Sequence, residues 1–233
     1  MQQVRAAYDH WLAEHKDDLI SPVDFEPGEA VPVKLDLPHI IPDPKTAEVE
    51  MNWLHQELLG QCRSQGGRYG YGGYLEQRTV YSADSYISVE NGEVRRRNLH
   101  LGFDFWTYEV GHPVCAPMAG TVHSLQDNAG HRDYGPTIIL QHEPQPGLVF
   151  YTLYGHLTRD SLGLVPGQFI AAADAIGEIG SADVNGGWVP HLHFQVILDL
   201  GESRGDFPGV GYADERDRWA IRCPDPAVFF GLD

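Results

Sequence analysis

Two stretches in the first third of the chain carry the hydrophobic spacing of amphipathic helices. The first lies within residues 2–16, where apolar side chains recur on one helical face. The second follows Asp43-Pro44, a pair suited to the N-cap and first turn of a helix, and should end near Gly66-Gly67. The apolar positions are Val4, Tyr8, Trp11 and Leu12 in the first stretch, and Ala47, Met51, Leu54 and Leu58 in the second.

The segment between these helices is rich in proline. Six prolines fall between Ser21 and Pro44, and each fixes its own φ angle and lacks a backbone donor. Because no regular period survives such spacing, we expect this segment to run extended across a surface of the protein.

Beyond residue 67 the pattern changes to short runs of Val, Ile, Tyr and Phe separated by Gly, Pro and Asn. This pattern predicts a mainly β fold of antiparallel strands. The clearest candidates are Thr137–Gln141, Leu148–Tyr154, Gln168–Ala172 and His191–Leu198. We divide the chain into a helical and Pro-rich extension at residues 1–75, a β domain at 76–200, and an irregular C-terminal tail at 201–233 that packs on the core.

Charge and composition narrow the class of partner. Sixteen Lys and Arg against 33 Asp and Glu give a formal net charge of −17, which repels nucleic acid and anionic membranes. No apolar run approaches the roughly 20 residues that span a bilayer, and the charged N-terminus lacks a secretory signal pattern. Cys62, Cys115 and Cys223 are an odd number without metal-type spacing, which fits a reducing compartment. We therefore expect a cytoplasmic protein.

Candidate chemistry lies in two histidine patterns, His100-Leu101-Gly102-Phe103-Asp104 and His191-Leu192-His193. A histidine followed four residues later by aspartate is expected about once by chance in this composition. His39/Asp43, His123/Asp127 and His156/Asp160 also satisfy that spacing. Spacing alone therefore identifies no site.

Strand geometry separates the first pattern from its look-alikes. In an extended strand His100, Gly102 and Asp104 share one face, and a glycine between the two polar side chains leaves space for an ion. His191 and His193 share a face in the same way. The apolar side chains on the opposite faces, Leu101, Phe103, Leu192 and Phe194, should enter the core.

If the two strands are neighbours, one His–Asp pair and one further histidine give three ligands that suit Zn²⁺ and leave a fourth position for water. Zinc acidifies its bound water and polarises a carbonyl, so an amide could be hydrolysed without a protein nucleophile. A nearby base is still needed, and His191 and His156 are the candidates. His156 stands where a predicted strand ends, in Tyr154-Gly155-His156-Leu157.

In order, spacing and flanks these residues resemble the lysostaphin/LytM-type zinc endopeptidases, over about residues 97–198. The motifs of that family are His-x-Gly-x-Asp, a later isolated His, and His-x-His. The resemblance implies that His100, Asp104 and His193 bind zinc, whereas His156 and His191 assist catalysis. It also implies the family fold, a small antiparallel β-sandwich or open barrel of the duplicated hybrid type with a narrow groove, here with an N-terminal helical extension.

The resemblance implies a zinc metallopeptidase that cleaves amide bonds in peptidoglycan-derived or other small peptides, with a peptide or muropeptide as substrate. Gln195 departs from the pattern, because the family commonly has Glu there. Two other functions stay open: a catalytically silent binding or regulatory module, and a histidine phosphocarrier-like domain. Asp104 argues against the phosphocarrier, since an anion would repel the phosphoryl group. The sequence leaves the oxyanion donor open, with Arg97 among the candidates.

Overall fold

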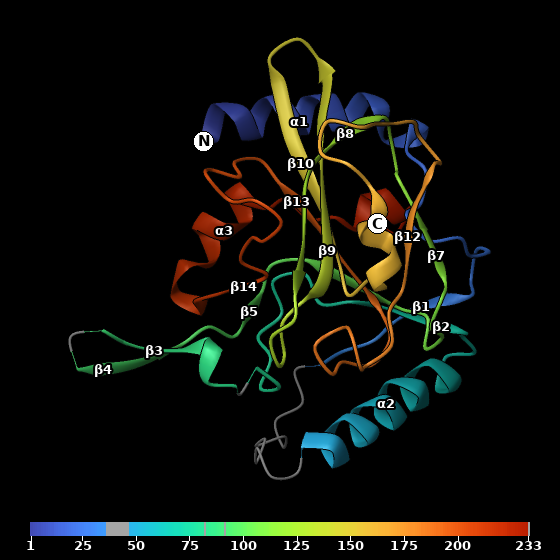
Figure 1. The fold of residues 1–233 in the computed structure, drawn as a ribbon, viewed down its shortest axis with the longest axis vertical. Helices are drawn as coiled ribbons and strands as arrows, with labels where there is room; N and C mark the ends of the chain where they lie inside the picture. Colours follow the sequence, from blue (N-terminus) through green and yellow to red (C-terminus); the bar gives the residue numbers. More distant parts are fainter. Residues whose placement is uncertain (36–46, 82, 91, 233) are drawn as a thin grey trace.

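One large sheet organises the fold (Figure 1). Within residues 1–35, 47–81, 83–90 and 92–232, which the computed structural model describes, eight strands form this sheet in the order β1-β2-β6-β13-β10-β9-β8-β11. Neighbouring strands are antiparallel except β1 and β2, which run parallel. The strands are β1 (Ala30–Pro32), β2 (Tyr69–Gly72), β6 (Phe103–Trp106), β8 (Gly120–Asn128), β9 (Gly135–Gln145), β10 (Leu148–Gly155), β11 (Phe169–Ile170) and β13 (Leu192–Ile197). The predicted mainly β, antiparallel architecture with an N-terminal helix is confirmed.

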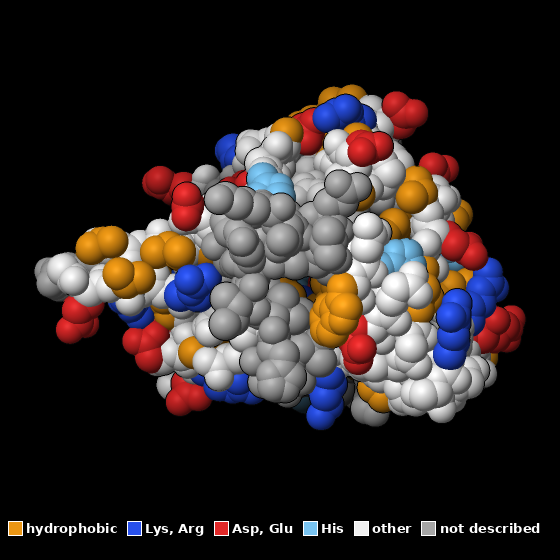
Figure 2. Space-filling view, turned by 90° about the horizontal axis from the view of Figure 1, so that it is seen from below, with side chains coloured by type: hydrophobic (Ala, Val, Ile, Leu, Met, Phe, Trp, Pro, Cys, Tyr) orange, Lys and Arg blue, Asp and Glu red, His pale blue; other side chains and the backbone are white. Residues whose placement is uncertain are grey.

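Smaller elements surround this sheet. They include the α-helices α1 (Gln2–His15), α2 (Ala47–Ser64) and α3 (Arg216–Arg222) and the two-stranded ribbons β3 (Ile87–Glu90) with β4 (Glu93–Arg96), β5 (Leu99–His100) with β14 (Val210–Gly211), and β7 (Pro113–Cys115) with β12 (Ala175–Glu178). The β3–β4 ribbon projects from the body of the molecule, at the left of Figures 1 and 2. Val89 and Val94 pair across it and are each 70% exposed, so the ribbon presents hydrophobic side chains to solvent.

Apolar side chains cover both faces of the sheet. Along β9, Ile138 and Leu140 enter one buried cluster, whereas Ile139 enters another. Because consecutive side chains of a strand point to opposite faces, the two clusters lie on opposite sides of the sheet. Ile197 of β13 belongs to the cluster of Ile139, and His193 shares its face by parity. The candidate site is therefore built on that side of the sheet.

Each helix and strand that the sequence predicted has a counterpart in the structure. Both helices are present, and α2 buries Leu54 and Leu58 on its predicted apolar face. The predicted N-cap pair Asp43-Pro44 lies outside the described residues. All four predicted strands overlap observed ones, which are β9, β10, β11 and β13.

The Pro-rich segment contributes more to the core than its prolines predicted. Residues Ala30–Pro32 form β1 beside β2, and Val23, Val33 and Leu35 are buried. A proline is compatible with a strand at the edge of a sheet, where its missing N–H breaks no ladder. The described part of the segment therefore runs extended along the edge of the sheet, but it also contributes the side chains of Val23, Val33 and Leu35 to the core. Residues 36–44 lie outside the described part of the chain.

The C-terminal tail is more regular than predicted. It contains β14 and α3, and Phe229 and Phe230 are buried among the apolar side chains of the sheet. The three-part division of the chain stays a prediction. No helix in the described residues has the length and apolar character needed to cross a lipid bilayer.

Helix α1 is anchored on the sheet by aromatic side chains. The rings of Tyr8 and Trp11 lie 5.2 and 5.4 Å from that of Phe150 on β10, between centroids. Tyr8 is fully buried, and its hydroxyl has no hydrogen-bond partner among the described residues. A buried polar group without a partner costs about 1–3 kcal/mol of stability.

Replacing Tyr8 with phenylalanine is therefore expected to raise the free energy of unfolding by about 1 kcal/mol, because the ring stays and the unpaired hydroxyl is removed. Denaturant titration measures the change. Tyr154→Phe is the matched control, since the Tyr154 hydroxyl is hydrogen-bonded to that of Thr152 at 2.9 Å and its loss should destabilise the protein. Equal shifts for the two variants would contradict the explanation.

Candidate metal centre

Strands of the large sheet bring the two histidine motifs together. On β13, His193 lies opposite Asp104 of β6 on one side and opposite Gly155, at the end of β10, on the other. His100 ends β5 and reaches the same place. The two motif strands are thus neighbours, which is the condition set by the sequence analysis.

The chain from His100 to Asp104 is not one strand, contrary to the prediction. β5 pairs with β14 through His100 and Val210, whereas β6 belongs to the large sheet. The strand is interrupted at Leu101-Gly102. His100 and Asp104 therefore approach each other from two separate sheets and not along one strand face.

Gly102 also has a role different from the predicted one. A Cβ atom at this position would lie 2.4 Å from Cε1 and 2.5 Å from Nε2 of His193, and 2.9 Å from the carbonyl oxygen of Phe194. Packing at those distances is impossible without displacing the ring or the strand. Gly102 therefore makes room for the imidazole of His193, and the expectation that it leaves space for an ion is wrong.

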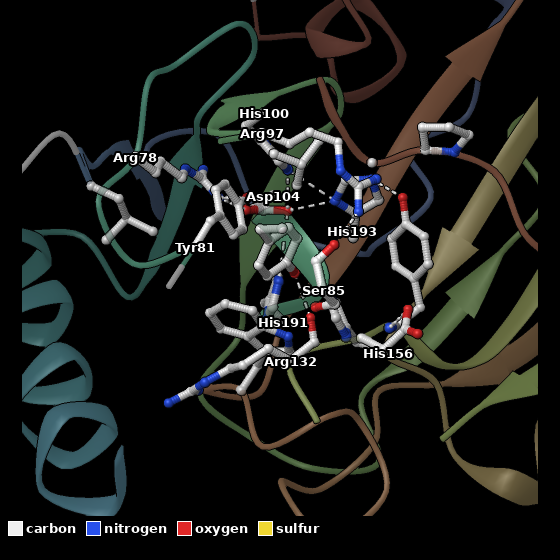
Figure 3. Close-up of a pocket in the computed structure, with 18 of the residues that line it drawn as sticks. Arg78, Tyr81, Ser85, Arg97, His100, Asp104, Arg132, His156, His191 and His193 are labelled. Carbon is white, nitrogen blue, oxygen red and sulfur yellow. Dashed lines mark hydrogen bonds and ion pairs between the residues drawn. The ribbon is translucent and has the colours of Figure 1, made fainter. Parts of the chain in front are cut away.

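Three potential ligand atoms converge in the buried centre shown in Figure 3. His193 Nδ1 lies 2.9 Å from His100 Nε2 and 3.1 Å from Asp104 Oδ1, and the last two atoms are 3.3 Å apart. Donor atoms bound at about 2 Å around a tetrahedral zinc ion are separated by about 3.3 Å. His100, Asp104 and His193 therefore form a candidate metal site whose spacing fits this ion.

The opposite nitrogen of each of these two imidazoles has a polar partner. His100 Nδ1 lies 2.8 Å from the carbonyl oxygen of Gly73, to which it can only donate. His193 Nε2 lies 3.0 Å from Oε1 of Gln195, which in turn donates through Nε2 to the Pro208 carbonyl. Such partners fix the tautomer and orientation of a metal-binding histidine. They leave the lone pairs of His100 Nε2 and His193 Nδ1 facing Asp104.

The protonation states also suit a metal site. Burial, followed by the charge of Arg78, lowers the pKa of His100 to about 4, so this ring is neutral near pH 7. Burial alone would raise the pKa of Asp104, but the neighbouring His100, Arg78 and His191 hold that pKa well below 3.8. A neutral imidazole beside an ionised carboxylate is the state in which both can bind a metal cation.

The predicted catalytic histidines lie side by side in the same centre. The ring centroids of His156 and His191 are 4.3 Å apart, and His191 Nε2 is 3.6 Å from Asp104 Oδ1. The Nδ1 atom of His156 donates to the carbonyl of Asn185, and that of His191 to the carbonyl of Val189. Each neutral ring therefore carries its lone pair on Nε2. Burial lowers the pKa of both rings below 6.5.

His156 adopts a backbone conformation that side chains seldom take. Its φ angle is +65°, in the left-handed region, directly after the end of β10. The conformation is held by hydrogen bonds from the His156 N–H to the Tyr134 carbonyl and from the Gly180 N–H to the His156 carbonyl. Such a cost in backbone energy is common at functional sites, where it fixes the direction of one side chain.

A cavity of about 210 Å³ opens onto all five residues. Aromatic side chains form much of its wall, and the ring of Trp106 stacks on that of His191 with centroids 5.6 Å apart. The cavity is lined by Leu35, Leu54, Arg78, Tyr81, Ser85, Tyr86, Arg97, His100, Asp104, Trp106, Arg132, Asp133, Tyr134, His156, Trp188, Val189, His191, His193, Asp206, Phe207, Pro208, Gly209 and Val210. A small molecule bound in this cavity would reach the three candidate metal ligands and also His156 and His191.

Comparison with known proteins points to the same five residues. The model of peptidase family M23 matches residues 98–203, the segment that carries all five of these residues. This segment belongs to peptidase family M23. A search of curated proteins gives no significant match.

Solved structures similar to this chain include three peptidases. A candidate M23 peptidase from Pseudomonas aeruginosa is 21% identical, covering 83% of this chain and 64% of that one, with a TM-score of 0.39. Lysostaphin is 25% identical over 49% of this chain and 40% of its own, with a TM-score of 0.35. A zinc-containing peptidase from Vibrio cholerae is 26% identical over 47% and 31%, with a TM-score of 0.35. This chain spans less than two thirds of each.

Some of the contacts that support the candidate metal centre come from outside the matched segment. Gly73 and Arg78 precede that segment and contact His100 and Asp104, while Pro208 and Cys223 follow it and hold the amide of Gln195. The motifs missed these residues because no local spacing connects them to the site. Of the four, Gly73 has a local signal in the sequence, because it lies in a glycine-rich run, and its φ angle of +92° is one that glycine adopts readily.

Arg97, the oxyanion candidate named from the sequence, lines the cavity and donates to the carbonyl of Ser85. Tyr134 is a second cavity residue near the ligands, with its hydroxyl 3.4 Å from Nε2 of His193. Arg97 therefore has a competitor, Tyr134, for the role of oxyanion donor.

Proposed function

We propose that this M23 chain is a zinc metallopeptidase that hydrolyses amide bonds in small peptides, with peptidoglycan-derived fragments as the first candidates. The observation that carries the proposal is the convergence of His100 Nε2, Asp104 Oδ1 and His193 Nδ1 within hydrogen-bond distance of one another, in a cavity that also contains two neutral histidines. Soluble fragments are proposed in preference to the intact wall because the sequence leads us to expect cytoplasmic residence.

The chemistry divides between the metal and the protein. Zinc, when bound, supplies a Lewis acid that acidifies a water molecule and polarises the substrate carbonyl. His191 and His156 hold their lone pairs on Nε2, because Nδ1 of each donates to a backbone carbonyl. Each ring can therefore accept a proton from the attacking water and return it to the departing amine. Their lowered pKa values keep both rings in the neutral form near pH 7, which is the form that has a lone pair.

The same contacts argue against a phosphocarrier. The carboxylate of Asp104 lies within 3.3 Å of the ring nitrogens of His100 and His193 and 3.6 Å from that of His191. A phosphoryl group on any of these nitrogens would face an anion held in a buried site, where repulsion is strong. The other alternative is a catalytically silent binding or regulatory module, and a measurement of turnover distinguishes it from a peptidase.

The test is hydrolysis of defined substrates by the full chain. Muropeptides and glycine-rich peptides are incubated with protein that carries zinc and with protein stripped by a chelator, and mass spectrometry follows the products. We expect cleavage by the zinc form, loss of cleavage on chelation, and recovery when zinc is restored. His193→Ala is the inactive control. Stoichiometric zinc with no cleavage of any substrate would favour the regulatory module.

A further inference from the structure

The two oxygens of the Asp104 carboxylate face different partners. Oδ1 lies toward the histidines, 3.1 Å from His193 Nδ1 and 3.3 Å from His100 Nε2. Oδ2 accepts a hydrogen bond from Nη1 of Arg78 at 2.6 Å, and the two buried side chains also form an ion pair. Charge-assisted hydrogen bonds of this kind are short and strong. The carboxylate is thus divided between the candidate metal site and a guanidinium group.

Contacts on several sides hold the guanidinium of Arg78 in place. Its Nε donates to Glu76 at 2.7 Å, and Nη1 also lies 3.1 Å from the Tyr81 hydroxyl. The side chain is only 3% exposed, and its charge sits 5.8 Å from the ring centroid of Trp106. Rotation away from Asp104 would leave the buried carboxylate of Asp104 without its guanidinium partner, which is costly.

The backbone around Arg78 is also fixed relative to the metal site. The Arg78 N–H donates to the carbonyl of Asn98 and the His100 N–H to that of Glu76, each at 2.9 Å. The other carboxylate oxygen of Glu76 accepts from the N–H of Leu35 at 2.9 Å. The backbone that carries the guanidinium is therefore fixed in position relative to His100, one of the candidate ligands.

From this arrangement we propose that Arg78 is a positioning residue that restricts Asp104 to one metal-binding oxygen, Oδ1. The inference rests on the proposed zinc site. Carboxylates can bind a metal through one oxygen or through both, and zinc can accept a fifth ligand. Because Oδ2 is occupied by Arg78, Asp104 supplies one donor atom, and the position that a second oxygen would take stays free for the substrate or water.

A purely stabilising role for Arg78 predicts something different. Glu76 already balances the charge of Arg78, and a bound zinc ion would balance that of Asp104. If Arg78 only offset the charge of the metal-free site, its removal would lower stability and leave the coordination of the bound metal unchanged. The two roles can therefore be separated by a measurement on the metal itself.

Cobalt(II) taken up in place of zinc provides that measurement, because the visible absorption of this ion weakens as its coordination number rises. Wild-type protein is expected to show the strong bands of a four-coordinate site. In Arg78→Met the freed Oδ2 can also bind, so the bands should weaken, and zinc affinity should change by about 10–100-fold as for other residues that orient metal ligands. Arg78→Lys keeps the charge without the planar fork, and its band intensity should lie between the two.

Arg68→Met is the matched control, since Arg68 also lies near two carboxylates, those of Glu29 and Glu109, but does not line the cavity. Wild-type bands in a folded Arg78→Met would overturn the inference. If that variant does not fold, Arg78→Lys decides, and unchanged bands there would overturn it too. Wild-type protein that takes up neither cobalt nor zinc would instead overturn the proposed metal site itself.

Discussion

Replacing Gly102 with alanine is expected to abolish stoichiometric zinc binding although no ligand is altered. The added methyl group would lie 2.4 Å from Cε1 of His193, and the carbonyl of Phe194 at 2.9 Å closes the other side. The imidazole must then rotate, and Nδ1 leaves its position 3.1 Å from Asp104 Oδ1. Displacing a ligand in this way should weaken zinc affinity by at least the roughly 10–100-fold that lost supporting contacts cost.

Metal analysis after dialysis and a competition titration with a chromogenic chelator measure this loss. Gly163→Ala is the control, because a Cβ at Gly163 meets nothing within 4 Å and its φ angle is not in the left-handed region. The far-ultraviolet dichroism of both variants should match that of the wild type. Full zinc retention by a folded Gly102→Ala protein would show that the ring of His193 is not where the structure puts it.

Loss of His156 or His191 should have the opposite pattern, with turnover removed and metal retained. Positioned acid–base groups contribute about 10²–10⁴-fold to rate, so His156→Ala and His191→Ala should each lower kcat by that range. Neither side chain belongs to the group of three whose ligand atoms converge. Zinc content should therefore stay at the wild-type level.

The measurement pairs metal analysis with steady-state kinetics on the best substrate found. His10→Ala serves as the control, since His10 is an exposed residue of α1 that does not line the cavity. A loss of zinc in either variant would move that residue into the ligand set. Of the two residues, His191 lies nearer to the candidate ligands, because its Nε2 is 3.6 Å from Asp104 Oδ1.

Sequence reasoning succeeded where local patterns decide the structure. The spacing of Tyr8 and Trp11 predicted α1, and alternating hydrophobicity around His193 predicted β13 with Leu192 and Phe194 in the core. These features depend on neighbours within a few positions along the chain. The five candidate site residues could be named for the same reason, since their motifs are short.

Sequence reasoning failed where pairing between distant segments decides the structure. Strand parity placed His100 and Asp104 on one strand, but pairing of His100 with Val210, 110 residues away, separates them into two sheets. Gly102 was recognised as special for a wrong reason, because the ring that it accommodates comes from β13. Arg78 carries no local signal, since only the folded backbone brings it to Asp104.

The contacts that orient the candidate ligands come from Gly73, which precedes the segment matched by the family model, and, through Gln195, from Pro208 and Cys223, which follow it. Zinc bound at such a centre would stabilise every segment that must be in place for it to bind. The zinc content would then show whether the segments that carry Gly73, Pro208 and Cys223 are in place. Damage to one of these segments would abolish zinc binding and leave the central sheet folded.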